Sequence, residues 1–161
     1  YGDAYSILLS HGQFNAAGND FAMYIQNTDT DDIIFSQAII SAAIATGIGI
    51  IEFYFDSIYV SGGNVSPDPV NLNRNSLIAL SMVHIHANAV AGELTGTLGT
   101  EFMHVDLSTT QNTVVIDFQD AIILPPGKTI GIATRSATAG LVSPDEYRIS
   151  LYMYKSHSSA A

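Results

Sequence analysis

Two histidines with a spacing that suits metal binding lie in residues 83–87, which read Val-His-Ile-His-Ala. On a strand, His84 and His86 point to the same side, so both imidazoles could approach one ion. His104 is a further candidate from a neighbouring strand. A structural zinc site takes four ligands, and two histidines are too few. The alternative is that both are solvated or hydrogen-bonded side chains, and no metal is assigned to them.

An acidic turn is the second candidate for metal binding. Asp29 and Asp31 lie in residues 27–32, which read Asn-Thr-Asp-Thr-Asp-Asp. Carboxylate, amide and backbone oxygens are the ligands that calcium prefers. The run lacks the glycine and the distal glutamate of a helical calcium loop. The alternative is a turn that simply carries negative charge, and no metal is assigned here either.

Catalytic motifs are absent from the sequence. Neither Gly-x-Ser-x-Gly nor the phosphate-binding Gly-x-x-x-x-Gly-Lys occurs. Residues 126–129 end like a phosphate loop, but the upstream glycine is missing and no helix is predicted to follow. Asp117 and Asp120 could act as acid and base in sugar cleavage, yet nothing favours them over other carboxylates. We expect no enzymatic activity and no cofactor.

The composition limits the classes of partner. The 161 residues are 47% hydrophobic and only 12% charged, with a net charge of −10. Ordinary soluble domains have roughly 25% charged residues, so part of this uncharged surface is expected to be covered by neighbouring molecules. The five Lys and Arg residues are scattered, which argues against nucleic acid as a partner. Without cysteine, no disulfide or thiolate site can form.

Alternating hydrophobic and polar residues predict strands along most of the chain. Residues 114–135 are predicted to form an antiparallel strand, turn, strand unit around Pro125-Pro126-Gly127-Lys128. Val114, Ile116 and Phe118 are expected on its core face. The apolar segment 33–51 has no flanking Lys or Arg, so we read it as two strands, or a strand and a short helix, and not as a membrane span.

These patterns predict an all-β protein, an antiparallel β-sandwich of jelly-roll type with about eight to ten short strands. Further strands are expected at residues 21–26, 47–60, 102–107 and 147–154. Residues 1–161 are expected to form one domain. Residues 1–12 are a possible N-terminal arm, and residues 156–161 a flexible tail.

An asparagine-rich loop is the candidate interface. Asn71, Asn73 and Asn75 alternate with other residues, so in an extended segment their amides share one side. Such a loop can lock against a sheet edge or against another subunit. Arg74 is the candidate for an ion pair across a subunit boundary. The alternative is that each asparagine satisfies a local turn.

Four segments together resemble small β-rich virion proteins of tailed bacteriophages. They are Glu52-Phe-Tyr-Phe, residues 66–76 with Pro-Val-Asn-Leu-Asn-Arg-Asn-Ser, residues 117–130 with Leu-Pro-Pro-Gly-Lys, and the closing strand at residues 147–154. The family comprises jelly-roll-like capsid decoration, head-fibre and tail-associated proteins. The resemblance implies a homo-oligomer, commonly a trimer, located in the virion, with the major capsid or other virion proteins as partners. It carries no catalytic residue.

Three functions follow as expectations. The first is a capsid decoration protein on the outside of a virion. The second is a tail-fibre or spike module that binds host glycans, for which Tyr54, Tyr59, Tyr152 and Tyr154 would supply aromatic faces. The third is a secreted filament subunit in which residues 5–10 insert as a strand into the next subunit.

Overall fold

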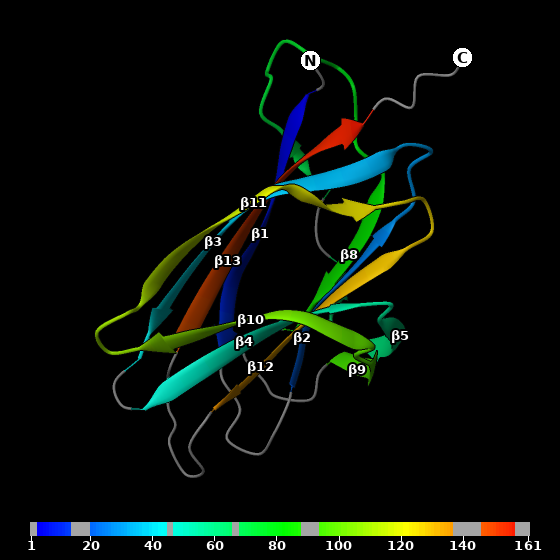
Figure 1. Ribbon diagram of the computed structural model, residues 1–161. Coiled ribbons are helices and arrows are strands. Elements are labelled where there is room, and N and C mark those ends of the chain that lie inside the picture. The colour runs from blue at the N-terminus through cyan, green and yellow to red at the C-terminus, as the bar shows by residue number, and fades with distance from the viewer. Residues whose placement is uncertain are drawn as a thin grey trace.

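The computed structural model describes residues 3–13, 20–44, 47–65, 68–87, 94–136 and 146–156. Throughout these ranges the protein is all-β, without a helix (Figure 1). No helix suited to crossing a membrane occurs in them. The strands are β1 (Ala4–Gln13), β2 (Asp20–Asn27), β3 (Asp32–Ala43), β4 (Ile48–Phe55), β5 (Ile58–Gly62), β6 (Asn64–Val65), β7 (Val70–Asn71), β8 (Met82–His86), β9 (Leu94–Thr97), β10 (Thr100–Ser108), β11 (Thr113–Leu124), β12 (Thr129–Ser136) and β13 (Glu146–Ser156).

The strands form two large antiparallel sheets and one small one. Sheet A has the order β11-β3-β13-β1-β7, sheet B has the order β10-β4-β12-β2-β8-β6, and β5 pairs with β9. Buried side chains from sheets A and B make one core between them, as in a β-sandwich. The all-β, antiparallel prediction is confirmed. The described chain contains thirteen strands and not eight to ten, because two-residue strands and the β5 and β9 pair supplement the long ones.

Alternation along β13 and β4 explains how the core forms. Tyr147, Ile149, Leu151 and Met153 are all buried between the sheets, as the sequence predicts. On β4, Ile51 and Phe53 face the same core. Glu52 and Tyr54 point the opposite way, but they are buried too, at 4% and 7% exposure. The outer side of sheet B is therefore partly covered by other side chains.

A second, smaller core explains some of this covering. Phe21, Tyr24, Ile85 and Leu94 form a separate buried cluster against which Tyr59 packs. Figure 1 shows β5 and β9 beside the end of sheet B. The predicted strands within residues 33–51 are β3 and β4, which lie in different sheets.

The unit at residues 114–135 is the main correction to the predicted fold. Its turn is present, with Gly127 at φ 79° and the Lys128 N–H donating to the Pro125 carbonyl at 3.0 Å. The flanking strands do not pair, however, because β11 belongs to sheet A and β12 to sheet B. The proline cluster specifies a chain reversal, but it does not specify whether the two strands bond to each other. Val114, Ile116 and Phe118 do pack against the core, as expected.

Of the residues expected to form an N-terminal arm, 4–12 lie in strand β1 of sheet A, and residues 1 and 2 lie outside the described part of the chain. β1 pairs with β13 over most of its length, from Ala4 opposite Tyr154 to Gln13 opposite Glu146, and with β7 on its other edge. The run at residues 5–10 is thus a strand of the chain's own sheet. Of the expected tail, Ser156 is the last residue of β13, and residues 157–161 lie outside the described part of the chain.

Candidate interaction surface

The asparagine-rich loop is anchored to Asp3, at the start of β1. Asn71 Nδ2 donates to Asp3 Oδ2 at 3.1 Å, and Asn73 Nδ2 donates to Asp3 Oδ1 at 2.9 Å. The Ser76 hydroxyl also donates to this carboxylate. One carboxylate thus holds three side chains from a loop about 70 positions away.

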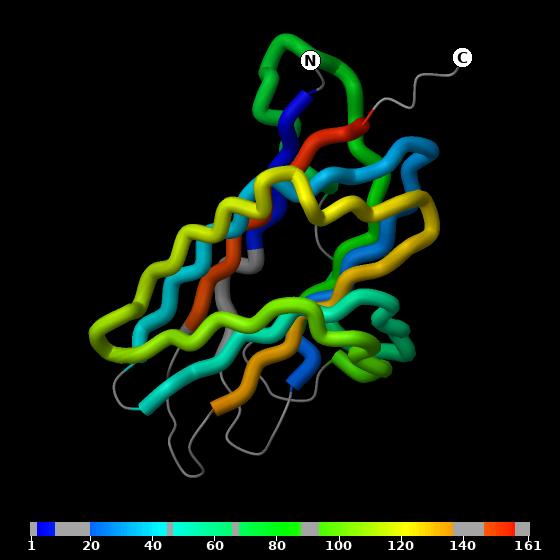
Figure 2. The backbone as a smooth tube through the Cα atoms, in the orientation of Figure 1, coloured from blue at the N-terminus to red at the C-terminus, as the bar shows by residue number. Residues whose placement is uncertain are grey.

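Local turns and edge contacts complete this anchor. The side-chain oxygen of Asn71 accepts from the Asn73 N–H at 2.8 Å, and that of Asn73 accepts from the Asn75 N–H at 3.3 Å. The Leu72 N–H donates to the Ala4 carbonyl at 2.8 Å. Figure 2 shows the green loop beside the blue start of β1 and the red end of β13. The sequence left two interpretations of these asparagines open, local turns and attachment to a sheet edge. The loop shows both.

Of the four predicted interface residues, Asn71 and Asn73 use their side-chain amides in hydrogen bonds within the chain. Asn75 is exposed, and Arg74 is exposed and forms no ion pair within the described residues. An intersubunit role for Asn71, Asn73, Arg74 and Asn75 stays a prediction. No local sequence pattern predicts the role of Asp3, because its three partners come from a distant loop.

The outer face of sheet A is the larger surface next to this loop. Strand register places its outward side chains in three rows: Ile123, Ile34, Tyr154 and Ala4; Asp117, Gln37, Tyr152, Ser6 and Val70; and Val115, Ile39, Ser150 and Leu8. Four of its aliphatic side chains, Leu8, Val70, Val115 and Ile123, are between 48% and 58% exposed. The signal in the sequence is that β3 and β13 carry Ile, Ser, Gln and Tyr where a solvated face would carry charges.

Charged residues lie toward the margins of this face. Asp117 and Asp120 are on the edge strand β11, and Asp32 opens β3. A bulge between Asp117 and Ile122 places Gln119 and Asp120 at positive φ, which breaks the regular edge of the sheet. Slight burial and a hydrogen bond to the Asp120 carboxylate raise the pKa of Tyr154.

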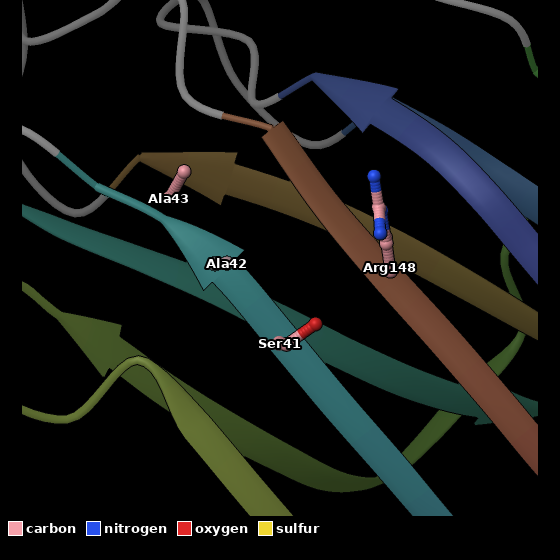
Figure 3. Close-up of a pocket in the computed structure, with 4 residues that line it drawn as sticks. All are labelled: Ser41, Ala42, Ala43 and Arg148. Atoms are coloured by element: carbon pink, nitrogen blue, oxygen red, sulfur yellow. The ribbon is translucent and has the colours of Figure 1, made fainter.

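The only cation on the outer face of sheet A, within the described ranges, is Arg148 on β13. It is exposed, and its register partner on β3 is Ser41. Arg148 lines a hollow together with Ser41, Ala42 and Ala43 (Figure 3). Small side chains on β3 leave this space beside the guanidinium.

The three histidines considered as metal ligands do not all lie together. His84 and His86 lie on β8 opposite Ile25 and Met23, so they do share one side of the strand. His104 lies on β10, at the other end of sheet B, with β2, β12 and β4 in between. It cannot join them. No group of three metal-ligating His, Cys, Asp or Glu residues occurs among the residues that the structure describes.

The Asp29 carboxylate bonds to several groups of the chain itself. Its Oδ2 lies 2.7 Å from the Lys155 ammonium and accepts from the Ser81 N–H at 2.8 Å, while its Oδ1 accepts from the Thr30 N–H at 2.9 Å. Burial alone would raise the pKa of Asp29, but the hydrogen bonds from Lys155 and the backbone lower it. In Asp31, the backbone carbonyl accepts from Asn27 Nδ2 at 2.9 Å. The turn thus connects β2, β13 and the segment before β8 through hydrogen bonds and an ion pair.

An ionic cluster around the buried carboxylate of Glu52 on sheet B was not predicted from the sequence. Arg135 Nε lies 3.3 Å from the Glu52 carboxylate, and Glu52 also bonds the hydroxyl of Tyr54. Burial and the carboxylates of Glu52 and Glu101 raise the pKa of Tyr54 to about 12. These residues come from β4, β10 and β12, so no local pattern could have grouped them. Glu52 bonds to both Arg135 and Tyr54. These contacts satisfy the Glu52 carboxylate, which is buried on the outer side of β4.

The tyrosines proposed for sugar binding divide into two pairs. Tyr54 is buried, and Tyr59 packs on Tyr24 with ring centroids 5.6 Å apart. Tyr152 and Tyr154 are half-buried on the outer face of sheet A. Tyr59 is half-buried as well, but it lies apart from this second pair, on β5.

No protein-family model, curated protein or solved structure matches this chain. The proposals below therefore rest on the residues and their geometry.

Proposed function

We propose that this protein is a non-enzymatic structural component of a virus particle, a capsid decoration protein that associates with copies of itself and with shell proteins. One observation carries the proposal. The outer face of sheet A spans five strands, exposes aliphatic side chains on both flanks, and keeps its charges near the margins, in a protein of net charge −10. Large exposed apolar patches usually mark interaction sites.

The strand order supports a jelly roll as the fold behind this function. Pairing the long strands from the outside inward gives β1 with β13, β2 with β12, β3 with β11 and β4 with β10. The remaining pairings, β13 with β3 and β12 with β4, join these hairpins into two sheets. Such a wound double strand is the jelly-roll arrangement, which is common in viral capsid proteins. One fold can serve several functions, so the jelly-roll arrangement supports the fold class and not the decoration function by itself.

Cohesion is the proposed mechanism. Burying apolar area contributes about 25 cal/mol per Å², and a face whose charges lie near its margins avoids the cost of burying unpaired ions. The remaining acidic surface keeps the protein soluble until it meets its partner.

Electron microscopy of the native particle tests the proposal. Gold-labelled antibody against this chain should decorate the capsid surface, and purified protein should rebind to particles stripped of it. The matched variant Val115→Lys places a charge on the outer face of sheet A, whereas Val60→Lys places one on β5, where Val60 is 67% exposed. We expect only Val115→Lys to reduce rebinding. Particles that never carry or bind the protein would overturn the proposal.

A tail-fibre or spike module that binds host glycans is the second candidate. Tyr152 and Tyr154 lie two residues apart on one side of β13 and present aromatic surface, which sugars use for stacking. Glycan-array binding that is lost in Tyr152→Ala, together with reduced host adsorption, would favour this candidate over decoration.

A further inference from the structure

We infer that two copies of this chain associate edge to edge through β10, so that sheet B continues from one copy into the other. The two β10 strands run antiparallel, and the two-fold axis stands perpendicular to sheet B at Val105. The inference rests on the self-association in the proposed function, and it specifies the surface and the symmetry. It leaves the outer face of sheet A free for other partners.

β10 is an edge strand with a long free side. Sheet A ends in β11 and β7, and sheet B ends in β10 and β6 (Figure 1). β6 and β7 have two residues each, whereas β10 has nine. Residues 103–108 of β10 pair with β4 without a register shift, which is the longest such run among the edge strands that the structure describes. A long regular edge is a template for a further strand.

β11, the other long edge strand, is less suited to pairing with its own copy. A bulge lies between Asp117 and Ile122, and Gln119 and Asp120 have positive φ. The charged side chains of β11 are Asp117 and Asp120, so a second β11 would bring carboxylates toward carboxylates. Bulges and charges of this kind are usual protections of an exposed edge.

Backbone groups along β10 are positioned to bond to another strand. The Ser108 N–H donates to the Gln111 carbonyl at 2.9 Å, so it points away from β4. Along an antiparallel strand, residues that bond to one neighbour alternate with residues that face the other side. The N–H and C=O groups of His104 and Asp106 therefore face the free edge, and those of Val105 face β4. Within the described residues no strand covers this edge.

The side chains of β10 favour one register. In a two-fold antiparallel pair, one residue lies opposite its own copy. With Val105 at the centre, His104 of each copy lies opposite Asp106 of the other. Such a pair exchanges both backbone hydrogen bonds, and the symmetry supplies it twice. With Asp106 at the centre, two carboxylates would lie opposite each other, which is destabilising. With His104 at the centre, Asp106 would lie opposite Phe102.

The outer side of the joined sheets gains a charge pair in this register. His104 and Asp106 are both exposed in a single copy. His104 Nδ1 lies 3.2 Å from the Glu101 carboxylate, which leaves Nε2 for Asp106 of the other copy. A protonated His104 then donates to both carboxylates. β10 thus carries the complement of its own charges, which makes a second copy the partner that fits it.

The inner side of the joined sheets is apolar in the same register. Val105 lies opposite Val105 of the other copy, and Met103 lies opposite Leu107. These side chains pack in or against the core between the sheets, so the apolar layer continues from one copy into the other. Rotation about an axis perpendicular to sheet B leaves sheet A of both copies on the same side of the dimer. Both outer faces of sheet A can therefore meet one shell.

Sedimentation equilibrium of the full chain over a wide range of concentration is the first experiment. A pairing of about five residues on each copy belongs with small, weak interfaces, so the mass should rise with concentration. We expect it to approach twice the 17.1 kDa of one chain. The resemblance to virion proteins implies a trimer, whereas this pairing is closed by two copies. A mass that stays at one chain, or that rises to three, would overturn the inference.

Exchange of two side chains tests the register. His104→Asp places two carboxylates opposite each other on both sides of the axis, and should raise the dissociation constant at least about tenfold. The double variant His104→Asp with Asp106→His has the composition of the wild type and restores both pairs, so it should recover most of the affinity. Val60→Asp adds the same negative charge on β5, where Val60 is 67% exposed, and should have little effect.

Circular dichroism and thermal unfolding check that each of these variants is folded. A folded His104→Asp variant that dimerises like the wild type, or a double variant as weak as the single one, would overturn the inference.

Cysteine pairing is a further experiment, and it does not depend on a loss of affinity. Val105 lies opposite itself in a pair without mutual hydrogen bonds, where Cα atoms are about 4.5 Å apart, a distance that a disulfide can span. The chain has no native cysteine. Under mild oxidation, Val105→Cys should give a linked dimer in much higher yield than Val115→Cys on β11, although Val115 is the more exposed residue. Equal yields would overturn the inference.

These outcomes are separate from those of the proposed function. If the protein coats particles but does not pair through β10, the decoration function stands and the edge pairing fails. If it dimerises through β10 but is never found on a particle, the pairing stands and the virion function fails.

Discussion

The side-chain nitrogen of Asn27 donates a 2.7 Å hydrogen bond to the carbonyl of Leu124, 97 positions away. The Asn27 backbone N–H donates to the Lys128 carbonyl at 3.0 Å, and its carbonyl accepts from the Gly127 N–H at 2.8 Å. Asn27 is fully buried at the end of β2 in sheet B. It therefore fixes the turn through which the chain passes from β11 in sheet A to β12 in sheet B.

Asn27→Ala should destabilise the fold by about 2–4 kcal/mol, because Leu124 and Asp31 would each lose a donor in a buried setting. Urea unfolding followed by circular dichroism measures this. The matched control is Asn112→Ala, since Asn112 is an exposed asparagine of another turn. Losses of less than about 0.5 kcal/mol for Asn27→Ala, the range of ordinary surface changes, would show that the turn holds without this side chain.

The Asp29 and Lys155 pair predicts a loss of stability in acid. The pKa of Asp29 is lowered below 3.8 in the folded protein, so the stability from its charge is complete above about pH 4 and is lost as the pH falls through the folded-state pKa. Asp29→Asn should cost about 2 kcal/mol at neutral pH. The difference from the wild type should shrink steadily below pH 4.

Urea unfolding at a series of pH values from neutral to acid measures that difference. The exposed carboxylate of Asp68 supplies the control, and Asp68→Asn should leave stability at neutral pH nearly unchanged. If the difference between wild type and Asp29→Asn stayed constant down to strong acid, the ion pair would not be a source of stability.

The anchor at Asp3 predicts the susceptibility of the asparagine loop to protease. Asp3→Ala removes the acceptor for Asn71, Asn73 and Ser76, so the loop should open more often. Trypsin cleavage after Arg74 should become at least about tenfold faster, given about 1 kcal/mol or more for each lost bond to a charged acceptor. Gel electrophoresis with mass spectrometry measures it.

Asn75→Ala is the control for that cleavage, because within the described residues Asn75 bonds to the loop through its backbone N–H and not through its exposed side chain. We expect it to be cut at the wild-type rate. Equal rates for Asp3→Ala and wild type would mean that the loop is held by its own turns.

The cluster around Glu52 on sheet B predicts a loss of stability in alkali. Burial and the carboxylates of Glu52 and Glu101 raise the pKa of Tyr54 from 10.0 to about 12. The fold thus favours the protonated phenol, and this contribution is complete below pH 10 and lost as the pH rises through 12. Tyr54→Phe should lessen the alkaline loss of stability and remove one tyrosine from the late part of the ultraviolet titration. Tyr152→Phe should leave that late part in place.

The sequence predicts the positions of the strands well, but it predicts poorly which strands pair with each other. Alternation locates the core faces of β4, β11 and β13, because side-chain direction is a local property of a strand. It places Val114, Ile116 and Phe118 toward the core, where the structure has them. The same residues were expected in a hairpin with β12, but β11 pairs with β3. Strand pairing depends on the whole wound topology, which a turn motif does not encode.

The candidate site shows the same division. The asparagine loop is recognisable from its composition, whereas its anchor Asp3 is not, since the two are joined only by folding. His84 and His86 share a side, as two-residue spacing requires, but His104 belongs to a distant strand of the sheet. Local spacing determines which way a side chain points. Which side chains lie next to it depends on the topology of the sheets.

The pairing of β1 with β13 also sets the order of events during synthesis. Residues 4–13 cannot complete their place in sheet A until residues 146–156 have left the ribosome, so β1 stays without its main neighbour while the strands between them are synthesised. The closest of the long-strand pairings along the chain, β4 with β10, can form first. We therefore expect slow, late closure of this domain, and nascent chains that end before β13 should depend on chaperones that cover exposed strands.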